Sequence, residues 1–471
     1  MHDATQGNIL RAEIPYCPPL NLFESFHDQT GAILLHSAIA HESCGQFSYI
    51  AIEPFKTLIA KNGTIKVDGQ SLPGNPFLAL KTLLADYKQP TQADLPPFQG
   101  GVAGAFSYDL YQYIESFSVE QSDALHFPDM YVGFYDVVIS FDHQAQRAWV
   151  VSTGWPEKTI ENRLTRAKHR LEHVCHLIAN PPIKTDETEL NLCEKENIHS
   201  HFNAQTYSDA VKRVIEYIQA GDIFEANISQ CFTTRDANLL PFDLYKRLMR
   251  KNPAPFAAYL NLGEFIVASA SPERFLKLMD GLVETRPIKG TRRRDPDPVA
   301  DKALAEELSN SEKDRAENIM IVDLMRNDLS KVCEEHSVMV SQLCGLETYP
   351  SVHHLVSVVT GELKPEFDAI DLLLATFPGG SITGAPKVRA MQIIAEIEPT
   401  KRGIYCGSIG FIGFNGNLEL SIAIRTYTIK QDWITFQAGG AVVIDSDPQD
   451  EYQETLTKSR ALHHALTCLD K

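Results

Sequence analysis

The sequence predicts a mixed fold of the α/β or α+β class. Two strand-like runs, "YVGFYDVVISFDH" (131–143) and "RAWVVSTGW" (147–155), are separated by a polar turn, so we expect a β-hairpin there. Helical periodicity appears in "IENRLTRAKHRLEHVCHLIA" (160–179) and in "AQTYSDAVKRVIEYIQAGD" (204–222), where Gly221 is placed to end the helix. The rest of the chain mixes strands with helices.

A polar, proline-containing segment divides the chain. "NPPIKTDETELNLCEKENIHSH" (180–201) interrupts both periodicities and is predicted to be a linker. We therefore expect a β-rich N-terminal domain over residues 1–200 and a second domain over residues 202–471. At 471 residues the chain is long enough for each part to bury a core.

Composition excludes several classes of protein. Lys and Arg number 43 and Asp and Glu 61, for a net charge of −18, which argues against nucleic acid as the main partner. No apolar run is long enough to span a membrane, and the first residues, "MHDATQGNILRAEIPY", do not have the pattern of a signal peptide. The nine cysteines include no CxxC pair, which is typical of reduced thiols. We expect a cytoplasmic protein.

In this acidic chain, positive charge gathers around one lysine. The stretch "ETRPIKGTRRR" places Lys289 among four arginines, which is compatible with an anion clamp, a solvated surface lysine or a nucleophile. Glu273, in "SPERFL", lies sixteen residues earlier, a spacing that suits the two arms of a hairpin. Such a hairpin would bring a general acid beside a nucleophile, but spacing alone leaves the alternatives open.

Two acidic helices are candidates for a metal site. In "DSDPQDEYQETLTKSRAL", Glu451, Glu454 and Lys458 recur at i, i+3 and i+7 on one face. A solvated charge ladder has the same pattern. In "SEKDRAENIMIVDLMRNDL", Glu317 lies where the helix turns from polar to apolar. Carboxylates from two helices, with positions left for substrate and water, are the ligands that proteins commonly offer to Mg²⁺.

Many ordered motifs resemble those of one family, the chorismate-utilising enzymes, and within it the branch of aminodeoxychorismate synthase component I. The match runs over roughly residues 205–465. The segments that carry it are "AGDIFEANISQ", "SASPERFL", "ETRPIKGTRRR", "DRAENIMIVDLMRNDL", "HHLVS", "FPGGSITGAPKVRAM", "CGSIGF", "SIAIRT" and "AGGAVVIDSDPQDEYQETLTKSRA". "ILLHSA" and "IAIEPF" extend a weaker match into the N-terminal part.

The resemblance implies an interleaved α/β sandwich, with two β-rich sheets and outer helices around a central cleft that binds chorismate and Mg²⁺. It implies that Glu317 and Glu454 bind the metal, with Glu451 nearby. His354 matches a residue of the catalytic site. The positions that match substrate-binding groups of the family are Arg425, Tyr405, Gly439, Gly440, Thr383, Gly384 and Lys458.

Lys289 decides the branch within the family. Anthranilate synthases carry alanine there, whereas aminodeoxychorismate synthases carry lysine. The resemblance implies that Lys289 adds to C2 of chorismate and so directs ammonia to C4, while Glu273 protonates the departing hydroxyl. The product, 4-amino-4-deoxychorismate, is a precursor of p-aminobenzoate and folate, and this amination belongs to the transaminase class. Because nearby cations lower the pKa of an amine, we expect the arginines to help keep Lys289 neutral.

Glu225, in "AGDIFEANISQ", departs from the family pattern. The amine-transferring members commonly have Gln at this position, and the isochorismate-forming members have a water-activating Lys. The missing lysine argues against water as the nucleophile. The role of Glu225 stays open: it holds an incoming ammonium ion or lies at the rim of the cleft.

The N-terminal match predicts a second ligand site. "LLHS" aligns with the LLES segment that binds inhibitory tryptophan in anthranilate synthases, and His36 replaces its Glu. A structural tryptophan beside Leu35, Ser37, Pro255 and Phe256 is one interpretation, and a packed corner of the β-domain is the other.

The expected partners are chorismate, ammonia and a glutamine amidotransferase subunit, because no amidotransferase-sized region is recognisable in this chain. Two alternatives remain: anthranilate synthase component I, and a catalytically silent subunit that binds chorismate or tryptophan.

Overall fold

The computed structural model describes residues 9–39, 44–117, 120–181, 197–350 and 352–467, and they form two twelve-stranded sheets. The first sheet has the order β1 (Leu10–Ile14), β10 (Arg147–Ser152), β9 (Val137–Asp142), β3 (Phe47–Ala51), β2 (Ile33–His36), β13 (Phe256–Asn261), β14 (Ile266–Ser271), β23 (Thr426–Lys430), β24 (Trp433–Val442), β12 (Glu225–Arg235) and β11 (His199–Ser200), with β20 (Gly384–Ala385) paired to β12.

The second sheet has the order β17 (Ile288–Arg293), β19 (Val352–Glu362), β16 (Leu282–Thr285), β15 (Arg274–Met279), β22 (Leu418–Ile422), β21 (Ser408–Gly413), β7 (Gly101–Phe106), β8 (Met130–Tyr135), β4 (Lys56–Lys61), β5 (Thr64–Val67) and β6 (Gln70–Pro73), with β18 (Met339–Thr348) paired to β19. Every pairing between named strands, in both sheets, is antiparallel.

Both sheets combine strands from the two halves of the chain. In the first sheet β2 pairs with β13, with Leu35 opposite Ala258. In the second sheet β7 pairs with β21, with Gly104 opposite Gly410. Strands from before and after the predicted boundary near residue 200 are therefore hydrogen-bonded to each other in both sheets. Most of the predicted linker, 182–196, lies outside the described residues.

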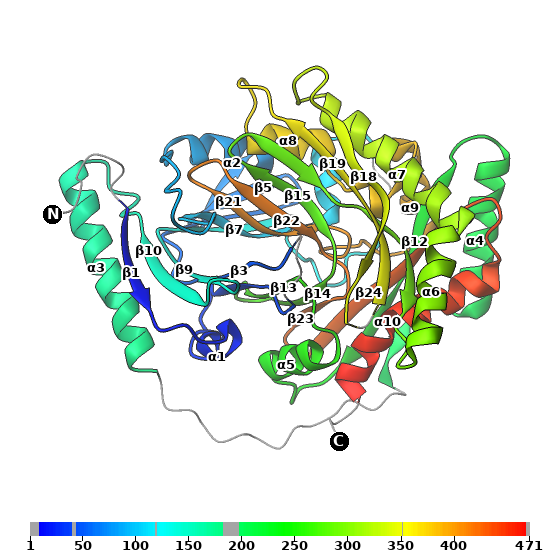
Figure 1. Cartoon of the computed structure of the whole chain (residues 1–471), viewed down its shortest axis with the longest axis horizontal. Helices are drawn as coiled ribbons and strands as arrows, with labels where there is room; N and C mark the ends of the chain where they lie inside the picture. Colours follow the sequence, from blue (N-terminus) through cyan, green and yellow to red (C-terminus); the bar gives the residue numbers. More distant parts are fainter. Residues whose placement is uncertain (1–8, 40–43, 118–119, 182–196, 351, 468–471) are drawn as a thin grey trace.

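The sheets lie face to face, and helices cover their outer sides (Figure 1). The helices are α1 (Pro19–Phe23), α2 (Pro76–Ala85), α3 (Ile160–Ala179), α4 (Ala204–Gln219), α5 (Pro241–Lys251), α6 (Pro298–Asn310), α7 (Glu312–Ser330), α8 (Ala369–Thr376), α9 (Lys387–Ile397) and α10 (Pro448–Thr467), with 3-10 turns η1 (Tyr108–Tyr113) and η3 (Gly380–Ile382). Helices α3, α5 and α10 contact the first sheet, whereas α6 and α7 contact the second. Separate apolar clusters fill the space under the helices and between the sheets. The predicted interleaved sandwich is confirmed.

The predicted helices at 160–179 and 204–222 are confirmed as α3 and α4, and the Asn203 side chain caps α4. The predicted hairpin is confirmed for β9 and β10. The strand-like run 131–143 forms two strands, β8 and β9, because the chain passes from the second sheet to the first between them. Asp136, at the crossing, is fully buried and accepts hydrogen bonds from Arg166 and Arg170 of α3, which compensate its charge.

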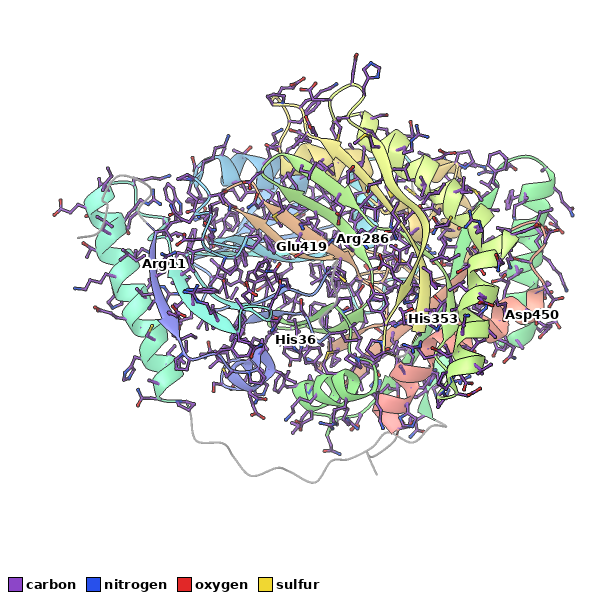
Figure 2. All side chains as sticks on the ribbon, in the orientation of Figure 1. Arg11, His36, Arg286, His353, Glu419 and Asp450 are labelled. Carbon is purple, nitrogen blue, oxygen red and sulfur yellow. The ribbon has the colours of Figure 1, made fainter. Side chains whose placement is uncertain are left out.

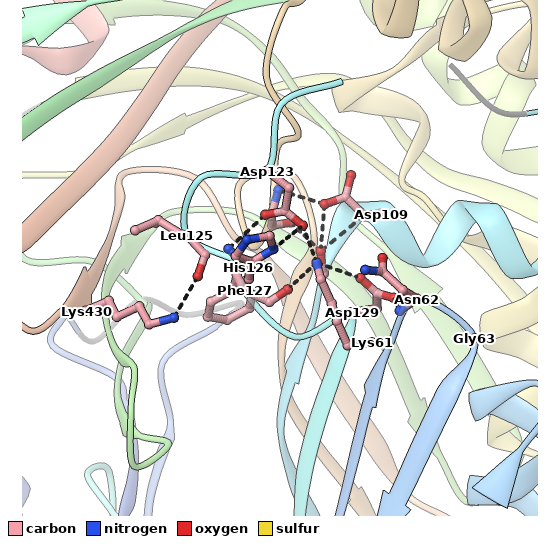
Figure 3. A network of polar contacts seen from close by, with 12 residues as sticks. Lys61, Asn62, Gly63, Asp109, Asp123, Leu125, His126, Phe127, Asp129 and Lys430 are labelled. Carbon is pink, nitrogen blue, oxygen red and sulfur yellow. Dashed lines mark hydrogen bonds and ion pairs between the residues drawn. The ribbon is translucent and has the colours of Figure 1, made fainter. Parts of the chain in front are cut away.

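A network of polar contacts surrounds the loop between β7 and β8 (Figure 3). The ammonium of Lys61 forms ion pairs with Asp123 at 2.6 Å and with Asp129 at 3.2 Å. From the C-terminal half, Lys430 donates a hydrogen bond to the carbonyl of Leu125. The loop between β7 and β8 is thereby attached to strand β23. No helix among the described residues is long and apolar enough to cross a membrane.

Candidate active site

Lys289 lies buried at the start of β17 and points at a carboxylate. Its side chain is 8% exposed, and its Nζ donates a hydrogen bond to Oε1 of Glu225 at 2.5 Å. Glu225, at the start of β12, is fully buried. The two strands belong to different sheets, so this ion pair joins the two sheets. Of the three interpretations of Lys289, its burial excludes a solvated surface lysine.

Glu273 lies just before β15, close to Lys289. Its carboxylate accepts a hydrogen bond from Ser381 Oγ at 2.6 Å and another from the backbone N–H of Ile288. The two residues are not on two arms of one hairpin, because β15 pairs with β16 while β17 pairs with β19. Glu273 and Lys289 are nevertheless close to each other, as predicted. Burial raises the pKa of Glu273 to about 7, although Ser381 and Lys289 oppose the rise.

The expectation that arginines keep Lys289 neutral was wrong. Each arginine that has a described contact binds a carboxylate of its own: Arg286 binds Glu347, Arg292 binds Glu307 and Asp314, and Arg294 binds Asp301. Burial lowers the pKa of Lys289, but the nearby carboxylates of Glu225, Glu317 and Glu273 more than offset this effect. The pKa of Lys289 therefore lies above its ordinary value, and the amine rests as a cation.

The three carboxylates predicted to bind or to adjoin the metal, Glu317, Glu451 and Glu454, lie on helices α7 and α10. Burial, together with Glu225 and Asp314, raises the pKa of Glu317 to about 7 against the opposing effect of Lys289. On α10, Glu451 is buried and accepts a hydrogen bond from Ser446, whereas Glu454 pairs with Lys458 at 2.6 Å and is partly exposed.

Gly440 of β24 leaves room for both carboxylates on α10. A Cβ atom there would lie 2.9 Å from Glu451 Oε2 and 3.1 Å from Glu454 Oε1. Glu451 Oε2 is buried and has no hydrogen-bond partner among the described residues. Among the residues that the structure describes, no three Asp, Glu, His or Cys side chains lie close enough together to form a complete metal site.

The remaining predicted residues surround the same region. Lys458 donates to the carbonyl of Gly439 at 3.0 Å. His354, on β19, hydrogen-bonds Thr291 through Nδ1, and burial together with the nearby charge of Arg425 lowers the pKa of His354 to about 3. Tyr405 is buried, one residue before Cys406, whose thiol is within the electrostatic reach of Glu273.

The turn that contains Thr383 and Gly384 lies against β12. The backbone N–H of Asn227 donates to the Thr383 carbonyl at 2.8 Å. Gly384 has a φ of +146°, and a Cβ atom there would lie 2.1 Å from the Glu225 carbonyl oxygen, so only glycine fits. Helix α9 follows this turn, with Pro386 at its N-cap.

Sequence reasoning missed the buried pair that supports this turn. Arg402 binds Glu398 and donates to the carbonyls of Ile382 and Asn227 at 3.0 and 2.6 Å. Ser381, the hydrogen-bond donor to Glu273, was also missed, although it belongs to the motif "GGSITG". The contact of Arg402 with the Asn227 carbonyl and that of Ser381 with Glu273 have no local signal, because these partners lie 175 and 108 residues away along the chain.

The four residues predicted to hold tryptophan line one cavity of about 640 Å³ between the sheets, and none of the predicted catalytic residues lines it. Ser37 Oγ donates to the carbonyls of Phe47 and Pro255. His36 and Glu419 also line the cavity, from the first and second sheets respectively, and Figure 2 shows Glu419 above His36. Burial, with a smaller effect of His143, lowers the pKa of His36 to about 4, so His36 is neutral near pH 7.

Comparison with known proteins agrees with this geometry. A sequence model of the chorismate binding enzymes matches residues 35–464. The chain is 38% identical over 440 residues to aminodeoxychorismate synthase component 1 of Bacillus subtilis (strain 168), a match that covers 92% of this chain and 91% of that protein. It is 38% identical over 458 residues to anthranilate synthase component 1 of Aquifex aeolicus (strain VF5), covering 95% and 92% respectively.

A crystal structure of anthranilate synthase component I from Streptococcus pneumoniae TIGR4 superposes with a TM-score of 0.80 at 32% identity, covering 90% of this chain and 94% of that one. The sequence match and the superposition each extend over most of the chain. The predicted fold and the resemblance to chorismate-utilising enzymes are therefore confirmed, and this chain belongs to the family of chorismate binding enzymes.

Proposed function

We propose that the chain is an aminodeoxychorismate synthase component 1, which converts chorismate and ammonia to 4-amino-4-deoxychorismate. The observation that carries the proposal is the buried amine of Lys289, placed close to the buried acid Glu273. A buried lysine beside a carboxylate that can accept its proton suits covalent catalysis. The relatives named for this activity support the same assignment.

In this mechanism the Lys289 amine attacks C2 of chorismate after its proton passes to Glu225, which lies within hydrogen-bond reach. The double bonds shift and the C4–O bond breaks, while Glu273 donates its proton to the departing hydroxyl to form water. Ammonia then adds at C4 and the C2–N bond breaks, its electron pair returning to Lys289. Because Lys289 occupies C2 in the intermediate, ammonia is directed to C4.

Binding of the substrate is assigned to groups that surround this pair. Arg425, Tyr405 and the Gly439–Gly440 backbone would hold the enolpyruvyl carboxylate. Lys458 and the Thr383–Gly384 turn would contact the rest of the molecule, and His354 would act in the catalytic site as a neutral imidazole. These roles follow the family motif position by position.

Magnesium would be held by Glu317 and Glu454, with Glu451 beside them. The residues fit the ion: Glu451 has a buried oxygen without a partner among the described residues, and Gly440 keeps the space before Glu451 and Glu454 open. Few protein ligands are the norm for Mg²⁺, which keeps several waters and binds substrate oxygens. When bound, the ion supplies the positive charge that offsets the ring carboxylate of chorismate.

A glutamine amidotransferase subunit is the proposed source of ammonia in this cytoplasmic folate pathway. The name "component 1" of the relatives supports a second component. Tryptophan is the proposed occupant of the cavity beside Leu35, Ser37, Pro255 and Phe256. The aromatic side chains that line this cavity, which include Phe47 and Phe411, suit an indole ring.

The test is mass spectrometry of the products formed from chorismate, ammonium and Mg²⁺. The parent protein is expected to give 4-amino-4-deoxychorismate. Lys289→Ala is expected to shift amination to C2 or to abolish turnover. Formation of 4-amino-4-deoxychorismate by Lys289→Ala at the parental rate would refute the covalent mechanism.

Anthranilate synthase is the second candidate, because relatives with that name are nearly as similar to the chain. Fluorescent anthranilate, formed by the parent protein without an added lyase, would establish that candidate instead. Binding of chorismate with no turnover at saturating ammonium would establish a silent binding subunit.

A further inference from the structure

One oxygen of the Glu225 carboxylate is unused. Oε1 accepts the hydrogen bond from Lys289, but Oε2 is buried and has no hydrogen-bond partner within the described part of the chain. The Glu225 side chain is 0% exposed, so bulk water does not solvate this oxygen. A buried carboxylate oxygen without a donor is costly, and an unfilled acceptor of this kind indicates a ligand.

The charge around Glu225 favours a cation as that ligand. Glu225, Glu273 and Glu317 lie within electrostatic reach of the same amine, Lys289. Of these three carboxylates, Glu225 contacts the amine directly and keeps its second oxygen unpartnered. A small cation with several N–H donors would satisfy Oε2 through charge-assisted hydrogen bonds.

Backbone pairing on both sides fixes the position of Glu225. Ala226 pairs with Val442 of β24, and Glu225 pairs with Ala385 of β20. Gly384 packs so closely that a Cβ atom would strike the Glu225 carbonyl. The preceding residue, Phe224, is 68% exposed, whereas Glu225 itself is buried.

From these observations we propose that Glu225 Oε2 is the binding site for the nitrogen donor, held as an ammonium ion beside Lys289. The inference rests on the proposed function, since it assigns a place to the second substrate of that reaction. It gives a use to the one residue of the "AGDIFEANISQ" motif that departs from the family pattern.

The protons balance with this assignment. Lys289 passes a proton to Glu225 and attacks C2, and Glu273 gives its proton to the C4 hydroxyl, which leaves as water. The bound ammonium then returns a proton to Glu273 and becomes ammonia, which forms the C4–N bond as the C2–N bond breaks. Glu225 finally returns its proton to Lys289. Chorismate and ammonium thus yield the aminated product and water, and every side chain regains its starting state.

Thermal melting without chorismate tests the site directly, because a cation that binds only the folded protein raises its melting temperature. The parent protein is expected to melt higher in ammonium chloride than in sodium chloride of equal ionic strength. Glu225→Gln is expected to lose this difference, whereas the matched control Glu216→Gln, an exposed position on α4, is expected to keep it. A difference that persists in Glu225→Gln would overturn the proposal.

Steady-state kinetics of Glu225→Gln distinguish two roles of Glu225, binding of ammonium and positioning of Lys289. Loss of one hydrogen bond to a charged group should raise KM for ammonium about tenfold in Glu225→Gln, with KM for chorismate nearly unchanged. An unchanged KM for ammonium with a lower kcat would assign Glu225 to Lys289 alone and overturn the proposal.

Potassium, which has the same charge and a similar size, should compete with ammonium in the parent protein, and absence of competition would count against the site. Neither the melting experiment nor this competition depends on which product the enzyme forms. Formation of anthranilate by the parent would refute the proposed function while leaving the ammonium site intact.

Discussion

Replacing Glu273 by Gln should stabilise the protein at high pH while removing the proposed catalytic acid. Burial raises the pKa of this carboxyl from its ordinary 4.5 to about 7. Below pH 4.5 the group is neutral in both the folded and unfolded protein, so its charge costs nothing. Above pH 7 it is ionised in both, and the folded protein bears the cost of burying the charge. Folding stability contributed by the neutral form is thus lost as pH rises from 4.5 to 7.

The magnitude follows from the pKa difference. At about 1.4 kcal/mol per pKa unit, the buried charge costs about 3 kcal/mol above pH 7. Gln keeps an oxygen to accept from Ser381 and Ile288 and carries no charge. For a chain of 471 residues, an unfolding entropy of about 1 kcal/mol/K converts this free energy to a rise of about 3 °C in melting temperature.

The assay is the melting temperature of Glu273→Gln and of the parent from pH 4.5 to 8.5. The difference should be near zero at the acid end and should grow to its full value between pH 6 and 8. Glu216→Gln, an exposed control, should show no such trend. A difference that is negative, or that does not change with pH, would refute the argument from burial. In turnover, Glu273→Gln should lose about 10²- to 10⁴-fold in kcat.

Two further substitutions test the surroundings of the site. Gly440→Ala places a methyl group 2.9 Å from Glu451 Oε2, so the Mg²⁺ concentration for half-maximal activity should rise about tenfold, and an unchanged Mg²⁺ titration would contradict the assigned metal site. Arg402→Leu leaves the Glu398 carboxylate buried and unpaired, which should cost about 3–5 kcal/mol and lower the melting temperature by about 3–5 °C. The double substitution Arg402→Leu with Glu398→Gln should recover much of that loss, and if it melts no higher than the single variant, the charge explanation fails.

Local interactions explain why the helices were predictable. Helix α7 begins where Ser311 accepts a hydrogen bond from the N–H of Asp314, and α10 begins where Asp447 accepts from the N–H groups of Gln449 and Asp450. These caps lie within three residues of their partners, so the sequence alone reveals them. The strands were less predictable. Nothing local in 131–143 distinguishes one long strand from two strands in different sheets, because the partners of Asp136 lie on α3.

The sequence by itself identified the family through its ordered motifs. It also predicted Glu273 as an acid, carboxylates for magnesium and Lys289 as the residue that defines the branch. Only the tertiary structure decided the charge on Lys289. Arg286, Arg292 and Arg294 are neighbours in sequence, but their guanidinium groups pair with other carboxylates, while Glu225, from 64 residues away, contacts the amine. Electrostatic energy depends on distance and burial in space, and neither quantity follows from position along the chain.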